Sequence, residues 1–256
     1  MRSPIGGLGL AAALALSASA AAGQAPLDAR VAPVRDGVVR FSFRARDGVC
    51  GNGRNINFSE NRSEYWEGEC DHGPVRVVLL RELGRTVKLE TYVGGRWRSR
   101  SDAVDLGTVG SSAASRYLMA LVRTGSPEVG RDAIMPAQLA DSVEIWPELL
   151  DVARDDAVPD ETRKAAVFWV GQAASRKAVE GLEALVDDDT ADLALRERAV
   201  FSLSQQRDAQ AVPALIRLAK EHPNPRIRQR ALFWLGQRDD PRVLDLFREI
   251  LSGSSR

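Results

Sequence analysis

The sequence predicts an α+β protein in which a small antiparallel β domain, residues 27–107, precedes an α-solenoid of about four helical hairpins, residues 111–252. Three observations support this prediction. The first part contains strand-length apolar runs separated by glycine-containing turns, and it holds both cysteines. The second part repeats itself about every 33 residues. Alternating apolar residues are typical of half-buried strands, whereas a repeated pair of amphipathic segments is typical of stacked helical hairpins.

The first 23 residues are predicted to be a signal peptide. Arg2 precedes an apolar stretch without acidic residues, and alanines at 18, 20, 21 and 22 offer cleavage sites. A retained N-terminal anchor is the alternative, but a permanent span needs about 20 apolar and larger residues. We therefore expect a bacterial protein that is periplasmic or secreted and that has no stable membrane insertion after signal cleavage.

In the β domain, the most convincing element is a hairpin formed by residues 75–80 and 86–93, with Gly84 in its turn. Further candidate strands are residues 38–44, 55–59 and 96–100. The segment 101–112 is compatible with either a hinge or a packed strand.

Cys50 and Cys70, 20 residues apart, are predicted to form a disulfide, because an even pair in an exported chain is typically oxidised. Such a bond stabilises by about 3 kcal/mol in the chain-entropy model. The alternative is a metal or redox site that also uses His72. No close cysteine pair or further ligand accompanies them, so we expect no metal and no cofactor.

The helical half carries one ten-residue pattern three times, from an initial Arg to a final Gln, with Phe at the sixth position. The copies are residues 163–172 (RKAAVFWVGQ), 196–205 (RERAVFSLSQ) and 228–237 (RQRALFWLGQ). A second amphipathic block follows each copy, at 178–186, 211–219 and 242–250, and an earlier block lies at 145–153. The first helix of that earlier unit is expected near 131–139, where Pro136 weakens the match, and one more helix is expected at 113–122.

These paired helices resemble HEAT repeats, specifically the short bacterial kind of the phycobilin-lyase type, over roughly residues 128–252. The resemblance implies stacked helical hairpins and says little about function. Phycobilin lyases act in the cytosol, which disagrees with a signal peptide. HEAT-type deoxyhypusine hydroxylases carry repeated His-Glu pairs, which this sequence lacks. HEAT-type DNA glycosylases need a basic concave face, whereas residues 151–256 hold 17 basic and 18 acidic residues. The β domain resembles no known family.

Composition and motifs argue against catalysis and against a nucleic-acid partner. The 35 basic and 35 acidic residues balance, which excludes a globally basic chain. His72 beside Asp71 has no accompanying nucleophile motif, and His222 in an inter-repeat loop is expected to be solvated. No glycine-rich phosphate loop is present.

Two rows of polar residues are expected to hold the repeats together. Arg163, Arg196 and Arg228 open the repeated pattern and should bind an acidic residue or loop carbonyl of the adjacent unit, with a site for an acidic ligand as the alternative. The glutamines that close the pattern, at 172, 205 and 237, should fasten the turn between helices.

Five aromatic residues are the candidate partner-binding site: Phe168, Trp169, Phe201, Phe233 and Trp234. The helical period places the three phenylalanines together on a partly polar side of the solenoid. Aromatic residues concentrate in interface cores, so this row could bind a partner or dock the β domain. The alternative is that the rings simply pack between neighbouring repeats.

The favoured function is an exported, non-catalytic scaffold or adaptor that binds an envelope protein or peptide through the solenoid surface, which needs no special residue. An enzyme or enzyme subunit is the alternative, with a small-molecule or glycan site in the β domain around His72, Asp71 and Trp66. A purely structural envelope component would show neither a binding surface nor such a pocket.

Overall fold

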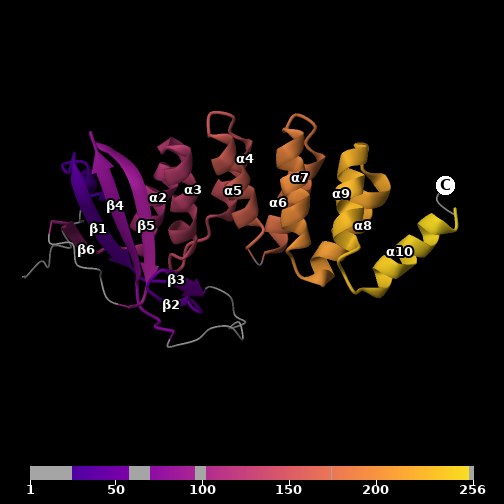
Figure 1. Cartoon of the computed structure of the whole chain (residues 1–256), viewed down its shortest axis with the longest axis horizontal. Coiled ribbons are helices and arrows are strands. Elements are labelled where there is room, and N and C mark those ends of the chain that lie inside the picture. The colour runs from indigo at the N-terminus through magenta and orange to yellow at the C-terminus, as the bar shows by residue number, and fades with distance from the viewer. Residues whose placement is uncertain (1–24, 58–69, 96–101, 174, 254–256) are drawn as a thin grey trace, which may run out of the picture.

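The computed structural model describes residues 25–57, 70–95, 102–173 and 175–253. The predicted signal peptide, the candidate strand at 96–100 and Trp66 lie outside these ranges. Within them, a sheet at one end of the molecule is followed by a row of helices that ends at the C-terminus (Figure 1).

The described residues of the N-terminal region form one four-stranded sheet and one small hairpin. After α1 (Leu27–Val31), the strands are β1 (Gly37–Phe43), β2 (Cys50–Asn52), β3 (Asn55–Asn57), β4 (Val75–Glu82), β5 (Arg85–Val93) and β6 (Val104–Thr108). The main sheet has the order β5-β4-β1-β6, and β2 pairs with β3.

The main sheet is mixed, and the prediction of a purely antiparallel domain was wrong in this respect. β6 comes from the segment 101–112 and pairs parallel to β1, whereas β1–β4 and β4–β5 are antiparallel. Two side-chain contacts join β6 to the edge of β1. Arg40 and Asp105 form an ion pair 2.8 Å apart, and the hydroxyl groups of Ser42 and Thr108 lie 3.2 Å apart.

The predicted β4–β5 hairpin is confirmed. Val75, Val77 and Leu79 alternate into the core and are fully buried. Leu83 and Gly84 form the connection with φ values of +51° and +79°. Two positive φ values suit the right-handed twist of a tight hairpin, and glycine adopts this conformation without steric cost.

A carboxylate on the outer side of this hairpin gives a testable pH dependence. Glu90 accepts hydrogen bonds from the Tyr92 hydroxyl at 2.6 Å and from Arg54 at 2.8 Å, and Lys88 lies 3.0 Å away. The Tyr92 hydrogen bond is the largest cause that lowers the pKa of Glu90 from 4.5 to about 2. A lowered pKa stabilises the folded state at neutral pH, and this contribution is lost as the pH falls from about 4.5 towards 2.

We therefore expect Glu90→Gln to melt at a lower temperature than the parent chain at pH 7, with the difference shrinking below pH 4.5 and vanishing near pH 2. Circular dichroism melts across this range measure the difference. Glu82→Gln, on the exposed end of β4, is the matched control. A melting difference for Glu90→Gln that stayed constant with pH would contradict the assignment.

The predicted disulfide between Cys50 and Cys70 is present, with the two Cα atoms 5.2 Å apart. It joins β2 to the segment that leads into β4, where Gly51 and Asp71 exchange backbone hydrogen bonds of 2.9 and 3.0 Å. Gly51 is needed here, because a Cβ atom would lie 2.7 Å from the Val93 carbonyl oxygen. The bond therefore fastens the small hairpin to the end of the main sheet.

Over the residues described between 111 and 253, the helical half forms one preceding helix and four helical hairpins. α2 (Ser111–Thr124) is followed by α3 (Pro127–Gln138) with α4 (Trp146–Arg154), α5 (Asp160–Val170) with α6 (Arg176–Asp187), α7 (Leu193–Ser204) with α8 (Asp208–Glu221), and α9 (Pro225–Leu235) with α10 (Pro241–Leu251). The predicted number of units is confirmed, and α3 tolerates Pro136 within its last turn. None of the described helices is long and apolar enough to cross a membrane.

The sheet packs against the first helices of the row rather than standing apart. The ring of Phe41 meets that of Tyr117 on α2 edge-on, with centroids 6.1 Å apart. The Arg46 amide donates to the Leu139 carbonyl at 2.9 Å, which ties the segment after β1 to the end of α3. One hydrophobic core therefore runs from the sheet into the helices.

Candidate protein-binding groove

The row of first-helix arginines joins neighbouring repeats, as predicted. Arg163 on α5 contacts Asp156 at 2.5 Å and Asp192, which precedes α7, at 3.0 Å. Arg196 Nε on α7 donates to the Val186 carbonyl at the end of α6 at 2.8 Å. Arg228 on α9 donates to the carbonyls of His222 and Pro223, both at 2.9 Å.

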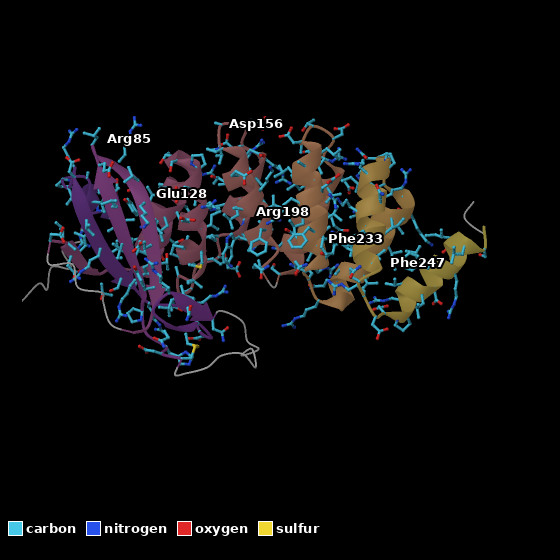
Figure 2. All side chains as sticks on the ribbon, in the orientation of Figure 1. Arg85, Glu128, Asp156, Arg198, Phe233 and Phe247 are labelled. Atoms are coloured by element: carbon cyan, nitrogen blue, oxygen red, sulfur yellow. A yellow bond between two sulfur atoms is a disulfide. The ribbon has the colours of Figure 1, made fainter. Side chains whose placement is uncertain are left out.

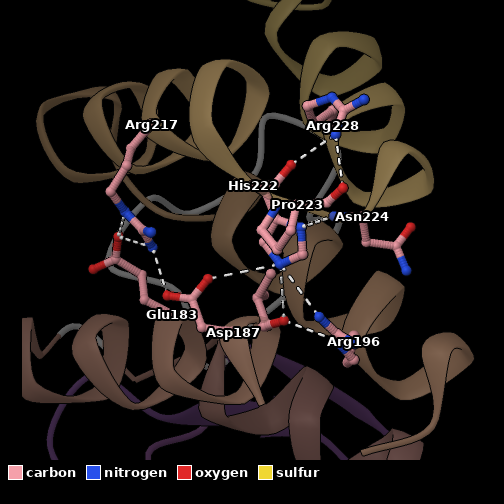
Figure 3. A network of polar contacts seen from close by, with 9 residues as sticks. Glu183, Asp187, Arg196, Arg217, His222, Pro223, Asn224 and Arg228 are labelled. Atoms are coloured by element: carbon pink, nitrogen blue, oxygen red, sulfur yellow. Dashed lines mark hydrogen bonds and ion pairs between the residues drawn. The ribbon is translucent and has the colours of Figure 1, made fainter. Parts of the chain in front are cut away.

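His222 lies inside this inter-repeat seam, so the prediction of a solvated histidine was wrong (Figure 3). It is 3% exposed at the end of α8, and its Nδ1 accepts the Asn224 amide hydrogen at 3.1 Å. In the neutral ring Nε2 then carries the hydrogen, which it donates to the Val186 carbonyl at 3.3 Å. The turn after α8 folds the ring inward, and the histidine is a structural residue.

The glutamine prediction was wrong by one residue in the third unit. Gln205 and Gln237 are exposed, and Gln172 is half-buried. Gln206 is 7% exposed instead and donates to the Gly171 carbonyl of the preceding repeat. Gln205 caps α7, so the following residue is the one that turns inward.

The first helices also line a surface groove of about 580 Å³. Its walls come from α3, α5, α7 and α9, which stack side by side (Figure 1). The lining residues combine apolar and charged side chains: Arg131, Glu161, Lys164, Ala165, Ala194, Glu197, Arg198, Phe201, Arg230 and Trp234.

Two of the five candidate aromatic residues, Phe201 and Trp234, line this groove, and the other three flank it. Phe201 and Trp234 bridge α7 and α9 with ring centroids 5.1 Å apart, which is the packing between repeats that the alternative interpretation expects. Trp234 also meets Phe233 at 4.9 Å, and Phe168 meets Trp169 at 5.6 Å. Phe233 is 53% exposed, so this end of the row is open to a partner. The described part of the sheet packs on α2 and α3, away from α5, α7 and α9, which carry these rings (Figure 1).

Arg198 on α7 is the residue that sequence reasoning did not single out. Its guanidinium carbon lies 5.4 Å from the ring centre of Phe168 and 5.0 Å from that of Phe201 (Figure 2). Its Nε is buried without an acceptor. The available signal was its spacing, because Arg198 precedes Phe201 by three residues and such pairs are neighbours on a helix.

The other charges at the groove are mutually paired. Lys164 contacts Asp160 at 2.6 Å and Glu161 at 3.4 Å. Arg230 lies 3.0 Å from Glu197. The hydrogen bond to Asp160, followed by that to Glu161, raises the pKa of Lys164, which therefore stays charged. The groove is thus an aromatic surface bordered by ion pairs.

The polar cluster that favoured an enzyme is engaged in backbone hydrogen bonds where it is described. An oxygen of the Asp71 side chain accepts the Gly95 amide hydrogen at 3.1 Å, and His72 Nδ1 lies 3.1 Å from the Val49 carbonyl. Trp66 is outside the described residues. In the described ranges, no three His, Cys, Asp or Glu side chains gather as a metal site would require.

The sequence model of the HEAT-repeat family matches residues 188–256, which contain α7 to α10. No curated protein matches the chain. The matched helices and the equivalent hairpins before them form a HEAT-like helical repeat region behind a small mixed sheet.

Proposed function

We propose that this protein is an exported, non-catalytic adaptor whose groove binds a segment of another cell-envelope protein. HEAT repeats commonly mediate protein–protein interactions, which agrees with a scaffold role. The observation that carries the proposal is the open aromatic row on the first helices, where Phe233 is 53% exposed beside Trp234.

The composition and dimensions of the groove suit a peptide segment. Interface cores are enriched in aromatic residues and arginine, and this groove presents both. Packed helices lie about 8–10 Å apart, so a segment that crosses α5, α7 and α9 spans about 20 Å. About six extended residues cover that length. A short peptide stretch therefore reaches from Phe168 to Phe233.

Export is supported by two features of the chain. The first 23 residues have the charge and hydrophobicity pattern of a signal peptide. The disulfide between Cys50 and Cys70 is typical of an oxidising compartment such as the bacterial periplasm. A partner in the cell envelope follows from that location.

Site-specific crosslinking in the native host tests the proposal. A photoreactive phenylalanine analogue at Gln229, exposed one turn before Phe233 on α9, is expected to capture one discrete protein partner. The same analogue at Arg176 on α6, whose side chain is 88% exposed, should not capture it.

Phe233→Ser in the same tagged chain is expected to reduce capture at least about 10-fold, because it removes an exposed aromatic contact of the kind that dominates interfaces. Leu244→Ser on α10 is the matched control, since Leu244 is 54% exposed and Phe233 53%. Equal capture by both variants, or capture of the same proteins from Gln229 and Arg176, would rule out the groove as the binding site.

A further inference from the structure

We propose that Arg198 is the specificity anchor of the groove and that it binds the carboxylate of an Asp or Glu side chain within the bound segment. This inference rests on the proposed function and specifies the chemistry of the segment.

Arg198 differs from the other arginines of the first helices in having no acceptor. Within the described ranges, each of the others has a carboxylate or carbonyl partner: Arg131, Arg163, Arg196, Arg226, Arg228 and Arg230. Arg198 makes no ion pair or hydrogen bond with any residue that the structure describes. A guanidinium carries five N–H donors, four of them on the two terminal nitrogens. In Arg198 those four have no acceptor among the described residues, and a ligand carboxylate would supply acceptors for them.

The two phenyl rings determine how that carboxylate can approach. The guanidinium carbon lies over the rings of Phe168 and Phe201, 5.4 and 5.0 Å from their centres, so the two rings fix the place of the group. Nε is buried, which leaves the edge formed by the two terminal nitrogens. That edge matches the two oxygens of a carboxylate in a bidentate pair. The same rings hold the side chain in place before binding, which lowers the entropic cost of the contact.

Neighbouring charges limit the ligand to a single carboxylate. Glu161 and Glu197 line the same groove, and their cationic partners Lys164 and Arg230 are already paired. A polyanion such as a nucleic-acid backbone would meet these two acidic side chains, whereas one carboxylate would meet only Arg198. The groove therefore favours an acidic residue among apolar ones over a run of negative charge.

The position of Arg198 indicates where in the bound segment the carboxylate lies. Arg198 lies on α7, between Phe168 on α5 and Phe233 on α9. A segment that contacts both phenylalanines passes Arg198 at its middle, so the carboxylate belongs to an internal side chain and not to a chain end. The predicted motif is an Asp or Glu flanked by apolar residues, one of which reaches Phe233.

Selection from a phage-displayed library of random peptides about 12 residues long, enough to span the groove, tests the inference on the purified chain. We expect selected peptides to share an internal Asp or Glu next to apolar residues. Synthetic copies should bind about 10- to 100-fold more weakly after Glu→Gln or Asp→Asn exchange, and about as much more weakly to Arg198→Met. Arg198→Lys should recover little of the binding, because lysine lacks the planar two-point edge.

The outcomes separate this inference from the proposed function. Peptides that lose binding on Phe233→Ser, but share no acid and bind Arg198→Met normally, would overturn the acidic anchor and leave the adaptor proposal intact. Selection of no peptide that depends on Phe233 would overturn both. Arg176→Met, on the exposed side of α6, is the control for loss of one surface arginine.

Discussion

Arg196→Met is expected to lower the free energy of unfolding by about 3 kcal/mol, because it removes a buried, charge-assisted hydrogen bond in the seam between repeats. Arg196 is 7% exposed, and its Nε donates to the Val186 carbonyl at 2.8 Å. Methionine fills a similar volume but offers no donor. The Val186 carbonyl would then depend on His222 alone, at 3.3 Å.

A control two residues away makes this prediction specific. Arg198→Met removes an arginine from the same helix, but one that has no acceptor among the described residues, so its effect should stay below about 1 kcal/mol. Urea unfolding followed by circular dichroism at 222 nm measures both variants. Equal midpoints for the two substitutions would show that the seam contributes little. The comparison also establishes whether Arg198→Met folds normally, which its use in binding experiments requires.

His222 stabilises the same seam between repeats. His222→Ala leaves the Asn224 amide without its 3.1 Å acceptor and opens a space beside Arg196. Because Arg196 and His222 share the Val186 carbonyl, their substitutions should not be additive, and the double variant should cost less than the sum of the single ones.

The repeat explains why most of the helical half could be predicted from the sequence. Its ten-residue pattern recurs with Arg at the start, so the helices could be predicted from the period, as could the binding of Arg163, Arg196 and Arg228 to an acidic residue or a loop carbonyl between units. The hairpin of β4 and β5 could also be predicted, because residues close together in the sequence specify it: the alternating apolar residues and Gly84.

The structural features that the sequence did not predict depend on packing between residues far apart in the chain. β6 joins the sheet beside β1, about 65 residues earlier in the chain, and nothing local indicates whether it runs parallel or antiparallel. His222 was assigned to solvent because it lies in an inter-repeat loop and is followed by Pro223, but this loop folds into the seam between α6 and α7. At the candidate site, the row of phenylalanines was visible from the period. The contact of Arg198 with both Phe168 on α5 and Phe201 on α7 depends on how closely these two helices approach.

Phe41→Ala is expected to destabilise the protein by about 3–5 kcal/mol and to loosen α2 together with the sheet. Phe41 on β1 is fully buried and contacts the rings of Phe43 and Tyr117. Removing its ring leaves a cavity between the sheet and α2 that rigid backbone on both sides cannot close. Val87→Ala on β5 is the control, because Val87 is 38% exposed and its loss leaves no such cavity.

Hydrogen exchange resolves where this destabilisation acts. If the sheet and the first helices share one core, amide protection in Phe41→Ala should fall in β1, β4, α2 and α3 by similar factors. Protection in α9 and α10 should change much less, because stacked repeats contact mainly their neighbours. A loss confined to the strands would mean that the sheet unfolds independently of α2. A joint loss would mean that the sheet serves as the N-terminal cap of the helical row, covering the apolar side of the first repeat while the groove at α5 to α9 stays free for a partner.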